Sequence, residues 1–415
     1  MEEALLREIS EKYLLPFFSG ATIELSSTPS KTSARAVAIL SPQIIGFKVN
    51  KADKYRLRFR RDQPFAQKTD PARETLLIES FVGILGTMEE QLSGPLKDDL
   101  LSTFQRRVVA RAAADDGGER QLLSVIDQMA QWATNLYEGA PIVSAIGIDP
   151  TATGSEELPL EKFSQDDFAA VLSNGFDTLL IFDPALNFSS HSVLPPNGAA
   201  LESCPWRHAA IANWTKTESG RVAVVLNRLG EILVFRDGLL LFARRGGKWH
   251  FLTHGPVLNQ MGVPKNKSIR RAIYETVLDA SFARTGACLG VVRANSGRKW
   301  EHAVAELDRL NGGASRKALS IARIVSNRKF QDLERTLRQE LVAIDGATII
   351  DHKGNVLAVG AIISLPAGST GGGRTAAAKE LAKLGLGVKV SQDGRISAYR
   401  PSSMPQTPEL AFELM

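Results

Sequence analysis

The sequence contains very little cysteine. Only two cysteines, Cys204 and Cys288, occur among 415 residues. They lie far apart and lack the short spacing that zinc sites use. This scarcity excludes a disulfide scaffold, and we expect both to be reduced, small core residues of a cytoplasmic protein.

Long apolar runs are also missing. No stretch approaches the roughly 18 to 20 apolar residues that a membrane-spanning helix needs. The first 18 residues, MEEALLREISEKYLLPFF, predict an amphipathic helix. They do not resemble a signal peptide, because they lack a basic start and a continuous apolar region. We therefore expect no membrane segment.

The chain has no strong excess of one charge. Its 50 Lys and Arg residues and 45 Asp and Glu residues leave a net charge of +5 at pH 7. The basic residues are spread between acidic ones and form no stripe, so nucleic-acid binding is not expected. An anionic small ligand is compatible with this balance.

What is present indicates two or three globular domains. Hydrophobic residues make up 44% of the chain and charged residues 23%, which is typical of a globular protein. Residues 1–205 predict a mixed α/β region, which a boundary near residue 140 divides. Its helices are predicted at 2–18, 96–113 and 121–137, and its strands at 142–148 and 178–182. The Pro- and Ser-rich segment 187–204 predicts a long loop or connector.

Basic residues alternate around Phe59 in the segment RLRFRR, residues 56–61. The alternation favours an edge strand with one solvated face. A basic groove for an anion is the alternative interpretation.

From residue 209 the pattern changes to consecutive antiparallel strands. They are predicted at 211–214, 222–227, 231–235 and 239–244, with turns at Gly220, Gly230 and Gly238. His250 and His254 are four residues apart, which on a helix would suit a metal. The surroundings resemble strands and Gly255-Pro256 follows, so a metal site is not favoured there.

Helices and strands then alternate. Helices are predicted at 268–284, 301–310, 315–324 and 332–342, and a buried strand at 287–292. We therefore expect an α/β fold, in which a C-terminal mixed β-sheet flanked by helices follows the mixed α/β N-terminal region. Its predicted limits are 206–400, with a C-terminal tail at 401–415.

Residues 344–399 carry the densest chemistry. Asp345 is predicted at a strand end, and a hairpin turns near Gly354. The glycine run Gly371, Gly372 and Gly373 precedes Arg374, Thr375 and a predicted helix at 376–384. A glycine loop before a helix N-terminus leaves free N–H groups and a positive dipole end, which suits an anion or phosphate. A strand at 388–390 then ends at Ser391.

In this order, the residues resemble a diadenylate cyclase domain, the nucleotidyltransferase unit that makes cyclic di-AMP. The resemblance covers about residues 220–400. It rests on Arg236-Asp237-Gly238, Thr285 to Val292, Asp345-Gly346-Ala347, the glycine loop with Arg374, and Val390-Ser391 ahead of Gly394 to Ser397.

The resemblance implies that two ATP molecules meet head to tail between two copies of the domain. It implies a homo-oligomer, with Asp345 as catalytic residue and ligand of Mg²⁺ or Mn²⁺, and Arg374 as the catalytic residue that neutralises phosphate charge. The nucleotide-binding residues that it implies are Gly346, Ala347, Gly371, Gly372, Gly373, Thr375 and Ser391. Residues 1–205 would then be a sensor or regulatory domain.

The second motif of the family is kept only in part. Thr375 stands where the family has histidine, Ala376 where it has a second arginine, and Gln392 where a glutamate is common. Lys379, Lys389 and Arg395 are candidates to supply the missing charge. The alternative is a nucleotide-binding sensor without turnover.

Overall fold

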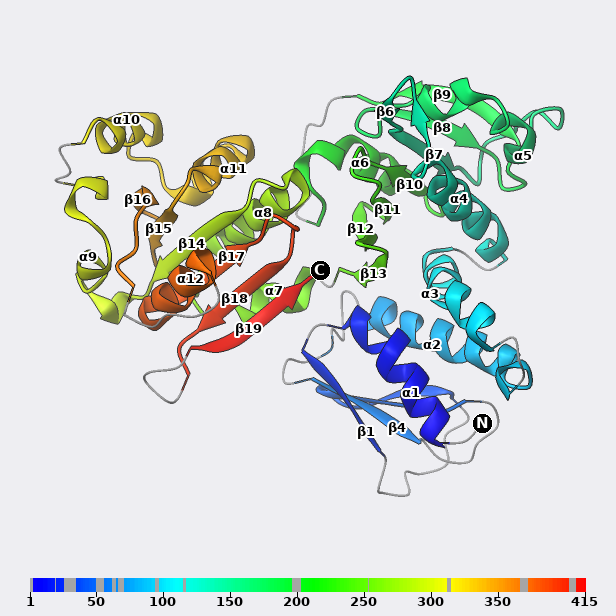
Figure 1. The fold of residues 1–415 in the computed structure, drawn as a ribbon, viewed down its shortest axis with the longest axis horizontal. Coiled ribbons are helices and arrows are strands. Elements are labelled where there is room, and N and C mark those ends of the chain that lie inside the picture. The colour runs from blue at the N-terminus through cyan, green and yellow to red at the C-terminus, as the bar shows by residue number, and fades with distance from the viewer. Residues whose placement is uncertain are drawn as a thin grey trace. The chain divides into compact units, whose positions relative to one another are not determined.

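The computed structural model describes residues 3–18, 20–25, 35–49, 56–61, 65, 71–93, 97–114, 117–195, 203–252, 254–311, 315–365, 372–402 and 408–415. The chain divides into two compact units, Met1–Pro256 and Val257–Met415. Figure 1 shows the elements of both. Helix α7 (His254–Gln260) spans the division. Short 3-10 turns connect longer elements at η1 (Leu15–Phe17), η2 (Gln91–Ser93), η3 (Asp167–Val171), η4 (Trp206–His208), η5 (Ala294–Ser296), η6 (Glu306–Asp308) and η7 (Phe330–Asp332).

The first unit begins with a four-stranded antiparallel sheet in the order β1-β4-β3-β2. Its elements are α1 (Glu3–Tyr13), β1 (Ala21–Leu25), β2 (Val37–Ser41), β3 (Ile44–Phe47), β4 (Leu57–Arg61), α2 (Pro71–Met88) and α3 (Lys97–Ala113). The expected edge strand at 56–61 is wrong, because β4 lies between β1 and β3. Arg61 is buried there, and its charge is paired with Glu74 of α2 at 2.8 Å.

A second sheet of seven strands follows, in the order β13-β12-β11-β10-β7-β8-β9. Only β7 and β8 are parallel neighbours. The elements of this part are α4 (Glu119–Trp132), β5 (Leu136–Tyr137), β6 (Ala140–Pro141), β7 (Ser144–Ile148), α5 (Leu160–Phe163), β8 (Thr178–Phe182), β9 (Phe188–Val193), α6 (Ala209–Thr217), β10 (Val222–Leu226), β11 (Ile232–Arg236), β12 (Leu239–Arg245) and β13 (Lys248–Phe251).

The predicted strands at 222–227, 231–235 and 239–244 are confirmed as β10, β11 and β12, but their partners differ from expectation. Strand β10 pairs with β7, in register from Val222 opposite Ile148 to Leu226 opposite Ser144. This pairing ties residues 206–256 to the first unit, whereas we expected them in the second.

Three local predictions are wrong. The helix predicted at 301–310 is helical only in α9 (Trp300–Ala303), and a 3-10 turn follows at Glu306–Asp308. Residues 211–214 belong to helix α6 rather than a strand, since a four-residue apolar run fits either element and α6 packs on β10 and β11. Residues 188–193 form edge strand β9 rather than loop. Its mostly polar, half-exposed side chains hid the strand from a pattern based on apolar residues.

The second unit is built on one mixed six-stranded sheet in the order β16-β15-β14-β17-β18-β19. Strands β14 and β15 are parallel, and the other neighbours are antiparallel. Its elements are α8 (Lys267–Ala283), β14 (Ala287–Val292), α9 (Trp300–Ala303), α10 (Arg316–Val325), α11 (Arg335–Ala343), β15 (Ala347–Asp351), β16 (Val356–Ala361), α12 (Gly373–Leu384), β17 (Gly385–Val390), β18 (Ile396–Arg400) and β19 (Glu409–Leu414). The mixed sheet with flanking helices matches the expected α/β class. The expected C-terminal tail contributes strand β19 to this sheet.

Helices cover both faces of this sheet. Ala347 and Ile349 share a buried cluster with Leu381 of α12, so they point to the α12 face. Thr348, between them, points to the other face and donates a hydrogen bond to the Leu341 carbonyl of α11 at 3.2 Å. Helix α8 packs beside α11. Strand β14 is therefore buried along its whole length.

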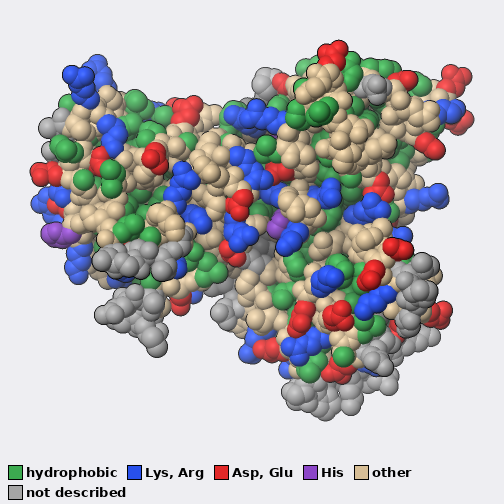
Figure 2. Space-filling model, viewed as in Figure 1, with side chains coloured by type: hydrophobic (Ala, Val, Ile, Leu, Met, Phe, Trp, Pro, Cys, Tyr) green, Lys and Arg blue, Asp and Glu red, His purple; other side chains and the backbone are tan. Residues whose placement is uncertain are grey.

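Cys204 and Cys288 are both free and buried. Among the residues that the structure describes, no helix is both long and apolar enough to cross a membrane. On the face drawn in Figure 2, basic and acidic side chains occur side by side.

Candidate functional site

The described site residues predicted between Asp345 and Ser391 gather at one end of the six-stranded sheet, whereas Arg236-Asp237-Gly238 lie between β11 and β12 in the first unit. Parallel pairing of β14 with β15 places Gly286 and Asp345, which precede these strands, at the same end. Antiparallel pairing of Ala287 with Val390 places Ser391 there too. Helix α12 starts beside the same strand ends, because it runs back over β14 and β17 (Figure 1).

Asp345 lies just before β15, at the start of the strand rather than at its end. It is exposed. Within the described part of the chain its carboxylate has no hydrogen-bond or ion-pair partner. A solvated carboxylate without a partner is available to a ligand.

Arg374 lies in the first turn of α12 and is half-buried. A β-carbon built on Gly286 would lie 2.8 Å from Arg374 Nη1, so the guanidinium lies directly on this glycine. Gly286 has a φ of +67°, which also favours glycine. Over the described residues the guanidinium has no hydrogen-bond or ion-pair partner. A cation is thus held one strand away from the Asp345 backbone.

The start of α12 has the open backbone of an anion site. Gly372, at the N-cap, provides no side-chain cap, and its φ is +76°. A β-carbon at Gly372 or Gly373 would meet nothing within 4 Å. The first-turn N–H groups of a helix have no acceptor within the helix, and the described residues provide no side-chain cap for them here. Gly371 lies outside the described residues.

Gly346 has a structural reason to be glycine. Its φ is +104°, and a β-carbon there would lie 2.5 Å from the Gly360 carbonyl carbon. The space beside Gly346 is thus filled by β16. We expected a nucleotide to approach the Gly346 backbone closely, but this space is not open to it. Ala347 is buried in the core and paired with Ala361, so only its backbone faces the site.

An ion pair braces the segment that packs on Gly346. Lys317 Nζ lies 2.5 Å from Asp308 Oδ1 and donates to the Gly360 carbonyl at 2.7 Å. Asp308 Oδ2 accepts from Ile362 N at 3.0 Å. Burial raises the pKa of Asp308, but the hydrogen bonds from Lys317 and Ile362 outweigh it and leave a net lowering. The sequence prediction missed these contacts. No local pattern indicates that Lys317 bonds to Gly360, or that Asp308 bonds to Ile362.

The remaining predicted residues differ in their exposure. Ser391 and Thr375 are half-buried, and their hydroxyls have no partner in the described structure. Ala376, where the family that the sequence resembles has arginine, is buried. Of the three candidate cations, Lys379 lies over the Tyr399 ring at 5.6 Å. Arg395 is exposed in the turn that Ser391 begins.

Lys389 is the candidate cation whose side chain lies on the sheet face that α12 covers. It lies opposite Cys288 in the β14–β17 pairing, so both side chains point to the α12 face. Arg374 acts on the same cysteine. Burial raises the pKa of the Cys288 thiol to about 12, while the Arg374 charge acts to lower it. The thiol is therefore neutral at pH 7 and is no nucleophile.

A divalent metal ion fits Asp345 only in company with a ligand. The described residues contain no group of three or more His, Cys, Asp or Glu that could hold a metal. Asp308 is already committed to Lys317 and Ile362. One carboxylate together with phosphates and water is a common way to bind Mg²⁺, so Asp345 fits a metal delivered with a nucleotide.

The two histidines four residues apart lie on different elements, His250 on β13 and His254 at the start of α7. His254 is buried, and its Nε2 lies 2.9 Å from the Leu240 carbonyl. Burial lowers the pKa of His254 to about 4. The weak metal interpretation of His250 and His254 thus has no support among the described residues.

Comparisons with known proteins add little. No protein-family model matches the chain. No curated protein sequence matches it. Among solved structures, the hypothetical membrane spanning protein from Bacillus cereus has 16% identity and a TM-score of 0.25, over 39% of this chain and 76% of that one. DacA from Staphylococcus aureus, solved as a double mutant, has 13% identity and a TM-score of 0.21, over 34% of this chain and 91% of that one. At such TM-scores neither likeness supports a conclusion about function.

Proposed function

We propose that the second unit binds ATP at this end of its sheet and condenses two ATP molecules into cyclic di-AMP. The observation that carries the proposal is a carboxylate, Asp345, set one strand from a guanidinium, Arg374, beside a helix N-terminus without a side-chain cap. Among the described residues neither charged group has a hydrogen-bond or ion-pair partner. These are the groups that a metal-bound triphosphate requires. The sequence resemblance to diadenylate cyclases gives the reaction.

The reaction needs two copies of the unit, since each site holds one ATP. Each 3′-oxygen forms a bond to the α-phosphorus of the other ATP and releases its proton to solvent. The bond from that phosphorus to the β-phosphate oxygen breaks, and pyrophosphate leaves. Two such steps give one cyclic di-AMP and two pyrophosphates.

Each residue has a defined part in this proposal. Asp345 would hold Mg²⁺ or Mn²⁺, which when bound neutralises phosphate charge and favours the ionised 3′-hydroxyl. The α12 amides from Gly373 to Thr375 and the Arg374 guanidinium would bind the triphosphate and stabilise the charge of the leaving pyrophosphate. Ser391, at the adjoining strand end, would donate a hydrogen bond to a phosphate oxygen. Residues 1–256 would regulate how the second units of two protein copies meet.

A second candidate is nucleotide binding without turnover. Thr375 and Ala376 replace a histidine and an arginine of the family motif, and Ala376 is buried. Loss of one guanidinium aimed at a phosphate removes about 1.5 to 3 kcal/mol of charge-assisted hydrogen bonding. A site with this deficit could bind ATP and signal its presence through the first unit.

One experiment separates the two functions. Purified protein is incubated with ATP and Mg²⁺ or Mn²⁺, and products are resolved by chromatography and mass spectrometry. We expect cyclic di-AMP that is lost in Asp345→Asn and reduced at least about tenfold in Arg374→Ala. Asp351→Asn, at the other end of the same strand, is the matched control and should retain activity.

Calorimetry with ATP completes this test. Tight ATP binding without any product would reject the cyclase and favour the sensor. No binding at all would reject both.

A further inference from the structure

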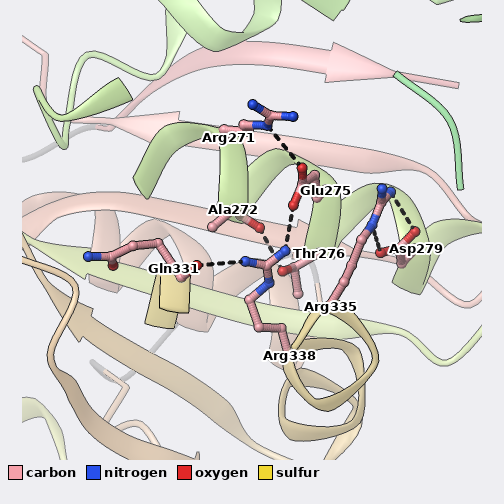
Figure 3. A network of polar contacts seen from close by, with 8 residues as sticks. All are labelled: Arg271, Ala272, Glu275, Thr276, Asp279, Gln331, Arg335 and Arg338. Atoms are coloured by element: carbon pink, nitrogen blue, oxygen red, sulfur yellow. Dashed lines mark hydrogen bonds and ion pairs between the residues drawn. The ribbon is translucent and has the colours of Figure 1, made fainter. Parts of the chain in front are cut away.

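Helices α8 and α11 are joined by two buried ion pairs (Figure 3). Arg335 of α11 donates from Nε and Nη2 to the two carboxylate oxygens of Asp279 on α8, at 2.6 and 2.9 Å. One turn further, Arg338 Nη2 donates to Glu275 Oε2. The Asp279 side chain is 0% exposed and that of Arg335 8%. Neither pair is a surface feature.

Further contacts fix the orientation of these groups. Arg338 Nη1 donates to the Gln331 carbonyl at 3.4 Å, just before α11. Arg271 Nε donates to the other oxygen of Glu275 at 3.2 Å. Burial lowers the pKa of Arg338, and the Glu275 charge acts to raise it. The arginine stays charged, so the network is a set of real ion pairs.

Such pairs contribute little net stability. Removing charges from water offsets most of their attraction, and apolar side chains of similar volume often serve as well. A planar, bidentate arginine contact does define geometry, however, because both N–H groups must meet both oxygens at once. The pairs between α8 and α11 thus fix how far one helix lies along the other.

This alignment matters because each helix leads directly into the candidate site. Gly286 follows Asp279 by seven residues (279 to 286), and Asp345 follows Arg338 by seven (338 to 345). Helix α8 ends at Ala283 and α11 at Ala343, so each connection to its strand is three residues long. A slip of α11 along α8 would move Asp345 relative to Gly286 and to the Arg374 guanidinium on it.

Helix α8 also holds the other side of the site. Ser281 Oγ, buried on α8, donates to the Gly394 carbonyl in the turn that Ser391 begins. The Gly394 N–H donates back to the Ser391 carbonyl at 2.9 Å. Helix α8 is therefore the common frame for Gly286 and Ser391, and the ion pairs described above connect α11 to that frame.

We propose that Arg335 and Arg338, with Asp279 and Glu275, are positioning residues that set Asp345 against the Gly286–Arg374 side of the site. The inference rests on the proposed function, since it assigns the network a role in that site. The four residues do not contact the nucleotide. They act through the three-residue connections 284–286 and 344–346, which contain Gly286 and Asp345.

The test replaces the ion pair without removing buried volume. In Asp279→Leu/Arg335→Met the helices keep an apolar contact, so the melting temperature should stay near that of the wild type. We expect cyclic di-AMP formation to fall at least tenfold at saturating ATP, with the KM for ATP changed less than twofold. Arg335→Lys keeps the charge but loses the bidentate contact. Its rate of cyclic di-AMP formation should therefore lie between the rates of the wild type and the double variant. Arg298→Met, which breaks the exposed Arg298–Glu301 pair, is the matched control and should alter neither quantity.

A second measurement does not depend on turnover. Hydrogen exchange followed by mass spectrometry should show at least tenfold faster exchange at 344–348 in the double variant, with β10 and β11 unchanged. Wild-type turnover and unaltered exchange in a stable double variant would overturn the positioning role. If the wild type makes no product, the cyclase proposal fails, and the exchange result alone still decides the role of the network.

Discussion

At the scale of single residues, the candidate site stands out by the groups that have no partner. Asp345 and Arg374 are unpartnered among the described residues, while nearby Asp308 and Lys317 are paired with each other. The family-like motif predicted the first two from sequence. It did not predict the glycines around them, because Gly286 and Gly360 matter only through contacts with distant segments.

Gly346 gives a prediction at this scale. Gly346→Ala forces a side chain into a φ of +104° and against the Gly360 backbone. We expect the free energy of unfolding to fall by about 2 kcal/mol or more. Urea unfolding followed by circular dichroism measures it.

The matched control is Gly373→Ala. Its β-carbon would meet nothing within 4 Å, and its φ lies outside the left-handed region. Its unfolding free energy should stay the same or rise by up to about 1 kcal/mol. Equal stability of Gly346→Ala and the wild type would contradict the close packing of Gly346 on Gly360.

At the scale of elements, charge that looks solvated in the sequence is partly buried. In β4 the RLRFRR pattern predicts a wet basic face, but Arg61 points inside and meets Glu74 of α2. Its guanidinium also lies 4.3 Å from the centre of the Phe65 ring. The neighbouring Arg60 does lie outside, beside Glu24 of β1. Alternation therefore places Arg61 on the buried face with Leu57 and Phe59, and α2 supplies the carboxylate that pairs with its charge there.

These two pairs allow a direct comparison. Glu74→Gln leaves the buried Arg61 charge without its counterion, so we expect a loss of about 3 to 5 kcal/mol in the free energy of unfolding. Arg61→Met/Glu74→Leu should lose much less, because no buried charge remains. Denaturant unfolding followed by circular dichroism measures both.

Glu24→Gln is the exposed control. The Arg60–Glu24 pair is 3.6 Å apart, and both side chains are more than 40% exposed. Loss of this ion pair should lower the free energy of unfolding by about 0 to 1 kcal/mol. Similar costs for Glu24→Gln and Glu74→Gln would show that Arg61 is not desolvated.

At the scale of the whole molecule, the chain forms two compact units, each with sheets assembled from distant segments. In the first unit β10 to β13 complete a sheet begun by β7 to β9. Two buried histidines lie in this unit, and burial lowers the pKa of both His208 and His254 to about 4. Their protonation is therefore linked to unfolding of this unit.

This linkage predicts acid sensitivity with a defined sign. In the unfolded chain a histidine binds its proton near pH 6.5, and in the folded unit only near pH 4. Between these values the unfolded state holds more protons, so stability falls as the pH is lowered. Within this window each histidine should lower the free energy of unfolding by about 1.4 kcal/mol for each unit by which the pH is lowered.

Unfolding in urea from pH 7 to pH 4.5, followed by tryptophan fluorescence, measures the slope. His208→Gln and His254→Gln should each flatten it, whereas His191→Gln, at an exposed position on β9, should not. A slope that no buried-histidine variant changes would contradict the prediction.

The sequence by itself determined the local features of this protein. It determined most strands and helices, a chemistry-bearing segment from Asp345 to Ser391, and the mixed α/β class. These follow from side-chain periodicity, glycine positions and capping residues within a few neighbours of each position. Its errors include 188–193, 211–214 and 301–310, which are short segments whose state depends on what they pack against, and the position of the strand at 56–61 within its sheet.

Only the tertiary structure decided which segments meet. It joined residues 222–251 to the strand at 144–148, placed Arg374 on Gly286, filled the space beside Gly346 with Gly360, and locked α8 to α11 through buried ion pairs. These contacts link positions 14 to about 90 residues apart. Pairing and burial over such separations depend on the energy of the whole fold, which no local pattern of residues contains.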